Sequence, residues 1–354
     1  FTILTVIFPF IFPPSDWFEK IHRKTGLWRM WTKPGGLIGM ILITAFFVIG
    51  YFDVYFNKTL TKADNFPIVL MIYSMWFLIW LGMYKAYRND IRIEQGLKPE
   101  EYNDPDDKVL VWPDLVYIEF IALILFQVFL IVWSILVAAP IEEPANPAAT
   151  PNPSKAPWYF LGLQEMLVYY DPWIAGVLLP TFIIVGLMAI PYLDINKKGD
   201  GYYSFKERRV GIFIFMYGWV VLWLFLIIIG TFFRGPNWNF FGPFEYWDTH
   251  KVEALTNVNL SEILWVKWLN QGLPSNILIR ESLGFIVTGL YLFVLPVILA
   301  KTYLKDMLAA YGPTRFVTLM ILGLVMLALP IKMYLRWIFN LQYIIAIPEW
   351  FLNI

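Results

Sequence analysis

The sequence predicts an all-α integral membrane protein with about seven transmembrane helices. Of its 354 residues, 59% are hydrophobic and only 15% are charged, whereas a soluble domain has roughly 25% charged residues. Seven apolar stretches are long enough to cross a bilayer, which takes about 20 residues. The connections between them alternate between many and few basic residues, a pattern typical of chains that cross a membrane repeatedly.

Each predicted span is an apolar stretch between polar or charged segments. In chain order, the seven stretches are residues 37–56, 66–87, 116–139, 174–193, 210–233, 283–304 and 316–338. They therefore predict seven helices joined by six connections.

The basic residues predict the orientation, because Lys and Arg concentrate in cytoplasmic connections. The N-terminal segment and the second, fourth and sixth connections are rich in them. The first connection contains only Lys58 and Lys62, and the third contains only Lys155. This pattern predicts a cytoplasmic N-terminus and an external C-terminus, with the third connection on the outer side.

The chain divides into three predicted parts. A charged connection, residues 90–114, separates an N-terminal extension with two transmembrane helices (1–110) from a unit of three (111–255). A C-terminal extension (256–354) supplies two more spans. In the connection before them, Trp265, Lys267 and Trp268 alternate with aliphatic residues, which predicts an interfacial helix.

The composition also excludes several kinds of site. Net charge is zero, so nothing favours nucleic acid, and the absence of cysteine excludes disulfides, covalent haem attachment and cysteine-ligated clusters within this chain. Only two histidines occur, His22 and His250, and neither lies in a predicted span. We therefore expect no metal or haem ligands here.

The third connection contains the most informative segment, residues 151–166. Pro151, Pro153 and Pro157 delay helix formation. The residues from Trp158 to Met166 then form an aromatic, amphipathic stretch with only two polar side chains, Gln164 and Glu165. This segment predicts an outer-side amphipathic loop helix that lines an apolar pocket.

Three runs of residues resemble one known family. The run from Glu142 to Glu165 resembles the loop after the first helix of the C-terminal domain of cytochrome b, which is a separate polypeptide, subunit IV, in the photosynthetic complex. The runs 191–209 and 234–248 resemble bacterial members of the same family. The family's Pro-Glu-Trp-Tyr tetrad corresponds to Ala156-Pro157-Trp158-Tyr159, so proline occupies the glutamate position.

The resemblance implies a haem-free subunit of a bc-type quinol:cytochrome c (or similar acceptor) oxidoreductase in a bacterial inner membrane. In that family, quinol loses electrons and protons in an outer-side pocket. The implied partners are a haem-bearing cytochrome b N-terminal subunit, a Rieske iron–sulfur protein and c-type cytochromes, in a dimeric complex. Haem b and the Rieske cluster would belong to these partners, and the altered tetrad is compatible with menaquinol.

Quinol oxidation requires a proton acceptor, and the nearest carboxylate to the tetrad is Glu165. We expect it about two helical turns after Pro157, in apolar surroundings that raise its pKa. The alternative is an interfacial residue bonded to a loop amide. The residues expected to line the quinone site are Pro157, Trp158, Tyr159, Leu161 and Gly162, and Asp171 is a candidate proton exit.

Two other functions stay open. One is a structural or quinone-binding membrane anchor of another respiratory complex, favoured by the missing tetrad glutamate. The other is a transporter, disfavoured because no span was found to carry the paired intramembrane charges expected at a substrate site. Pro348 to Phe351 imitates the family's tetrad, but it follows the last span and is interpreted as coincidental.

Overall fold

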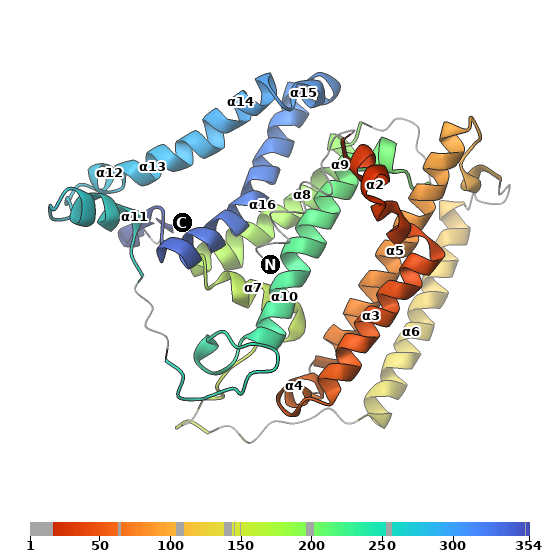
Figure 1. Cartoon of the computed structure of the whole chain (residues 1–354), viewed down its shortest axis with the longest axis horizontal. Helices are drawn as coiled ribbons and strands as arrows, with labels where there is room; N and C mark the ends of the chain where they lie inside the picture. Colours follow the sequence, from red (N-terminus) through yellow and green to blue (C-terminus); the bar gives the residue numbers. More distant parts are fainter. Residues whose placement is uncertain are drawn as a thin grey trace. The chain divides into compact units, whose positions relative to one another are not determined.

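The computed structural model describes residues 17–62, 65–103, 110–137, 144, 146–148, 150–195, 202–252, 257–350 and 352–354. The described chain is helical nearly throughout (Figure 1). It divides into two compact units, one formed by residues 155–199 and 210–354 and the other by residues 15–154 and 200–209.

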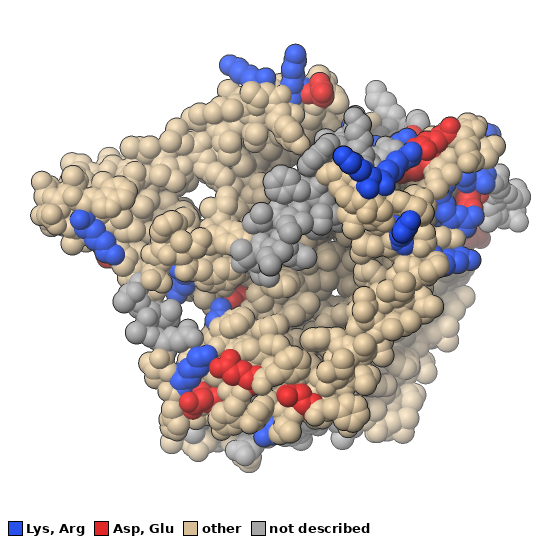
Figure 2. Space-filling view, in the orientation of Figure 1, with Lys and Arg blue, Asp and Glu red and all other residues tan. Residues whose placement is uncertain are grey.

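In the part of the chain that the structure describes, seven helices are long and apolar enough to cross a membrane. They span Lys33–Tyr51, Phe66–Glu94, Val111–Leu136, Ile174–Leu193, Phe205–Phe233, Ser282–Lys301 and Pro313–Phe339. Each coincides with one predicted stretch, so the chain is an all-α multi-pass membrane protein. On the face drawn in Figure 2, charged side chains lie in separate groups with large uncharged areas between them, as expected for helices that face lipid.

The N-terminal unit begins with α2 (Trp17–Thr25) and is built around α3 (Lys33–Tyr51) and α5 (Phe66–Glu94). Gly36 and Gly39 of α3 lie directly against the indoles of Trp80 and Trp76, with no room for a Cβ. The Trp76 indole donates to the Gly36 carbonyl at 3.1 Å. Small residues that admit large side chains from a neighbouring helix are typical of membrane helix contacts.

The first span is shorter than the predicted stretch, which ran to residue 56. The helix ends at Tyr51, and α4 (Val54–Leu60) starts separately. The Asp53 carboxylate accepts hydrogen bonds from the amides of Tyr55 and Phe56 at 3.0 and 2.7 Å. This N-cap starts a new helix inside an apolar run, and hydropathy alone does not reveal it.

Residues 202–209 belong to the same unit as α5. Asp90 accepts from the Ser204 hydroxyl at 2.6 Å and from the Phe205 amide at 3.0 Å. The Asn89 side chain donates to the Tyr203 carbonyl at 3.0 Å. Helix α6 (Val116–Leu136) also belongs to this unit, and every residue from 110 to 137 is exposed.

In the described ranges, the second unit contains the amphipathic segment and four spans. Its helices are α7 (Leu161–Met166), α8 (Leu179–Leu193), α10 (Phe225–Ile228), α11 (Leu260–Glu262), α12 (Ile277–Arg280), α13 (Ser282–Gly289), α14 (Leu295–Lys301), α15 (Lys305–Tyr311) and α16 (Pro313–Phe339). Helix α9 (Phe205–Phe215) contains the boundary between the two units. The predicted interfacial helix forms as α11 and a π-helical turn, Ile263–Trp268.

The chain after α16 folds back along this unit. Strands β1 (Ala346–Ile347) and β2 (Leu352–Asn353) pair antiparallel. The Gln342 amide donates to the Val258 carbonyl at 2.9 Å. Gly284 in α13 lies against the Ile344 carbonyl with no space for a side chain, so the returning chain packs directly on a membrane helix.

Candidate functional site

The amphipathic segment begins where its prolines end. Pro157 is extended, a 3-10 turn covers Trp158–Phe160, and α7 follows. The Gln164 side chain accepts a hydrogen bond from the Ala156 amide at 2.8 Å. Lys155 donates to the Thr231 carbonyl at 2.7 Å and lies 4.8 Å from the centre of the Trp247 ring. The segment is therefore held at its start by contacts distant in sequence.

Glu165 is completely buried, and its carboxylate has three partners. Arg234 donates through Nε to Oε2 at 2.9 Å and through Nη2 to Oε1 at 2.7 Å. The Trp238 indole donates to Oε2 at 3.1 Å, and the Tyr169 hydroxyl donates to Oε1 at 3.1 Å. Charge-assisted bidentate pairs of this kind are the strongest hydrogen bonds in proteins.

The prediction that the Glu165 carboxylate lies in apolar surroundings is wrong. Both oxygens accept hydrogen bonds, from Tyr169 and from two residues after the span that ends at Phe233. Burial would lower the pKa of Arg234, yet pairing with Glu165 raises it. Burial and the nearby Glu165 charge raise the pKa of Tyr169. The cluster thus holds Arg234 charged and Tyr169 neutral.

The residues predicted to line a quinone site fall into two groups. Pro157 and Tyr159 are exposed, and Trp158 is half-buried. Leu161 and Gly162 are buried; a Cβ on Gly162 would meet Ile227 and Trp223 at 3.4 Å. The first group presents an exposed, mainly aromatic surface, and the second packs against the span Phe205–Phe233.

Asp171, the predicted proton exit, lies where the next span begins. Its carboxylate accepts from the Trp173 amide at 3.1 Å and from the Asn353 side chain at 3.0 Å, and its carbonyl accepts from the Ala175 amide at 2.9 Å. The side chain is half-buried. These contacts cap the start of a helix and fasten the C-terminal strand to it.

Several charged residues near the cluster were missed by sequence reasoning. Lys332 and Arg336 lie inside the span Pro313–Phe339, so the earlier conclusion about intramembrane charges overlooked them. Lys332 is 1% exposed. An ionisable residue inside a predicted span is itself a signal of function. Arg234 carried a weaker signal, as the first charged residue after an apolar run.

Neither histidine joins this cluster. His22 is buried in the other unit and accepts a hydrogen bond from the Trp31 indole at 3.1 Å, while His250 is exposed. Within the described ranges, no group of three or more His, Cys, Asp or Glu side chains is placed to hold a metal ion.

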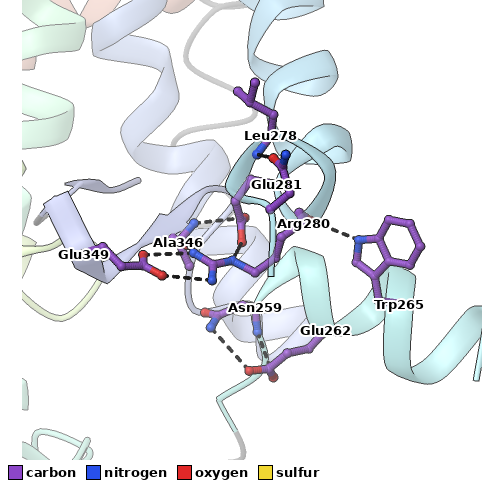
Figure 3. A network of polar contacts seen from close by, with 9 residues as sticks. Asn259, Glu262, Trp265, Leu278, Arg280, Glu281, Ala346 and Glu349 are labelled. Carbon is purple, nitrogen blue, oxygen red and sulfur yellow. Dashed lines mark hydrogen bonds and ion pairs between the residues drawn. The ribbon is translucent and has the colours of Figure 1, made fainter. Parts of the chain in front are cut away.

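A second polar network surrounds Arg280 (Figure 3). Arg280 donates to both carboxylate oxygens of Glu349, at 3.0 and 2.9 Å. It also donates to the buried Glu281 at 3.2 Å, and Glu281 accepts from the Ala346 amide at 3.1 Å. Glu349 belongs to the tetrad-like run, of which Phe351 lies outside the described residues. Its carboxylate joins the C-terminal segment to Arg280 at the start of the sixth span.

Comparison with known families identifies the central part of the chain. Residues 144–244 match the family described as cytochrome b(C-terminal)/b6/petD. This stretch contains the whole amphipathic segment and Arg234, and it is similar to the C-terminal domain of cytochrome b. No solved structure matches the chain. The family match supports a subunit of a b-type cytochrome complex, an oxidoreductase assembly of the membrane.

Proposed function

We propose that this chain is a haem-free subunit of a bc-type quinol oxidoreductase and forms part of its outer-side quinol oxidation site. The observation that carries the proposal is the family match over residues 144–244, which includes the segment from Pro157 to Glu165. A cytochrome b N-terminal subunit would hold the haem b, and a Rieske protein the iron–sulfur cluster. Menaquinol is the proposed substrate, c-type cytochromes are the proposed acceptors, and the membrane is a bacterial inner membrane.

The exposed side of the segment is the proposed quinol surface. Tyr159 offers a hydroxyl and an aromatic face, and Pro157 and Trp158 complete the apolar wall. Because Leu161 and Gly162 are packed in the core, this wall is held in a fixed position. A pre-positioned wall lowers the entropy cost of orienting a ring between two electron acceptors.

Glu165 is the proposed proton acceptor, and its contacts define what that role requires. Both carboxylate oxygens accept hydrogen bonds, two of them from Arg234, so the proposed acceptor is held by donors. Transfer from a quinol hydroxyl requires Arg234 to release at least one carboxylate oxygen. Asp171, at the half-buried start of the following span, is the proposed next group on the outward path.

The test is menaquinol oxidation by the purified native complex, together with its haem and iron–sulfur spectra. We expect both b-type haem and a Rieske signal in the complex, and we expect Glu165→Gln to lower kcat about 100-fold or more, as is typical for loss of a general base. Glu245→Gln is a suitable control because Glu245 is exposed. A Glu165→Gln complex that assembles and turns over normally would remove Glu165 from the mechanism.

A second function, a membrane anchor without turnover at this site, is favoured by two observations. Pro157 occupies the family's glutamate position, and every oxygen of Glu165 already has donors. The same complex distinguishes the two functions. An anchor would leave menaquinol oxidation unaffected by substitution of Tyr159, whereas the quinol site requires the KM for menaquinol to rise.

A further inference from the structure

The C-terminal third of α16 contains a lysine for which the described residues supply no acceptor. Lys332 lies inside the seventh span and is 1% exposed. Its Nζ has no hydrogen-bond partner among the described residues. An ionisable side chain placed in the hydrocarbon region costs about 2.5–3.5 kcal/mol even by the lowest scales. A residue this unfavourable for stability needs a functional reason.

Lys332 cannot easily reach water. It lies seven residues before the helix end at Phe339, about 10 Å along the axis. Side chains on an α-helix lean toward its N-terminus, which here points the lysine back into the membrane. The rings of Tyr170 and Tyr343 cover it, with Nζ 5.9 and 5.4 Å from their centres.

The groups packed around this lysine supply no acceptor for it. Helix α8, the π-helical turn Leu290–Val294 and α15 pack on α16. The first two contain no charged residue, and α15 (Lys305–Tyr311) directly precedes the N-terminal end of α16, far along the helix from Lys332. Arg336 follows one turn later and adds a second positive charge that acts on Lys332. Cation–π contacts with Tyr170 and Tyr343 offset part of the cost of burial, but they leave the three N–H donors without oxygen partners.

The carboxylate that acts on Arg336, that of Glu165, is already paired with another arginine. Arg336 interacts electrostatically with Glu165, Arg234, Tyr169 and Tyr343, and Glu165 is bound to Arg234. Arg234 and Arg336 therefore both interact with Glu165, whereas the charged group that acts on Lys332 is Arg336, another cation. Tyr169, which donates to Glu165, also lies beside α16, with its ring centre 6.1 Å from that of Trp337.

We propose that Lys332, supported by Arg336, binds the acceptor oxygen of an amphiphilic membrane molecule. The shared chemistry is a hydrogen-bond-accepting oxygen with partial or full negative charge, which a quinone carbonyl or a phospholipid phosphate can supply. The depth of Lys332 in the span favours the quinone carbonyl, since phosphates stay at headgroup level. The identification of the bound molecule as a quinone rests on the proposed function. The proposal that Lys332 binds an acceptor oxygen does not.

The experiment uses the native complex with Lys332→Met, and Lys301→Met as control. Lys301 is an exposed lysine at the C-terminal end of the sixth span. Equilibrium binding of a short-chain menaquinone and the phospholipid phosphorus retained after purification are measured for both variants. We expect Lys332→Met to weaken menaquinone binding about tenfold, as for loss of one charge-assisted hydrogen bond, with Lys301→Met unchanged.

The two sources give different results. Loss of retained phosphorus with unchanged menaquinone binding assigns the site to a lipid phosphate, and loss of menaquinone binding assigns it to a quinone. No change in either measurement overturns the proposal. Because binding is measured at equilibrium, a complex that oxidises no quinol refutes the proposed function without deciding this site.

Thermal unfolding provides an independent check. If Lys332 binds a ligand, Lys332→Met removes a donor that is buried and unpaired in the ligand-free complex. The ligand-free variant then unfolds at the same temperature as the ligand-free native complex, or at a higher one. A lower unfolding temperature would reveal a stabilising partner within the protein and would also overturn the proposal.

Discussion

Breaking the buried pair between Glu165 and Arg234 is the sharpest test of the structure. The carboxylate is 0% exposed and the guanidinium side chain 11% exposed, and two hydrogen bonds of 2.9 and 2.7 Å join them. Glu165→Gln keeps the shape of the side chain but leaves Arg234 as a buried, uncompensated charge. Removing one partner of such a pair typically costs about 3–5 kcal/mol of unfolding free energy.

The expected loss of unfolding free energy follows from the burial of the unpaired charge rather than from the attraction between the two charges. Two buried ions lose most of their hydration, so their mutual attraction is largely offset by desolvation. The double variant Glu165→Met with Arg234→Met removes both charges and both desolvation penalties. We therefore expect it to recover most of the stability lost by either single variant.

The assay is thermal unfolding of the purified complex in detergent, with all variants measured at the same protein and detergent concentrations. Glu245→Gln is the matched control, because its pair with Lys251 is exposed and 3.5 Å long, and exposed pairs contribute little. If Glu165→Gln unfolds at the temperature of Glu245→Gln, the carboxylate is not paired as described. If the double variant is as unstable as the single ones, the reasoning from desolvation is wrong.

Two further predictions concern other parts of the chain. Gly284→Ala should lower the unfolding free energy by about 1–3 kcal/mol, because a Cβ would overlap the Ile344 carbonyl. Gly289→Ala is the control and should leave the unfolding free energy unchanged, because Gly289 has open space around it. Equal unfolding temperatures for the two variants would contradict this packing. Burial lowers the pKa of His22 from 6.5 to about 4, so neutral His22 stabilises α2 fully above pH 6.5 and loses this contribution as the pH falls toward 4. Amide hydrogen exchange in α2, corrected for intrinsic rates, should therefore become faster between pH 7 and pH 5 in the native protein but not in His22→Phe. An equal increase in both proteins would exclude His22 as the cause.

The sites of membrane crossing were predictable because transfer into lipid depends on local composition. A run of about 20 apolar residues is favourable in a bilayer whatever the rest of the chain does, so all seven spans were found. The start of α7 after Pro157 was predictable for a similar reason, since proline restricts the backbone locally. The end of the first span at Tyr51 was missed because a single carboxylate, Asp53, caps a new helix.

The surroundings of Glu165 were decided only by the tertiary structure. Arg234 and Trp238 lie 69 and 73 residues away along the chain, and no periodicity or motif joins them to α7. The same is true of Lys332, whose identity and apolar neighbours are visible in the sequence but whose missing acceptor is not. Hydropathy is a sum over neighbours along the chain, whereas compensation of a buried charge depends on which distant groups the fold brings within hydrogen-bond distance.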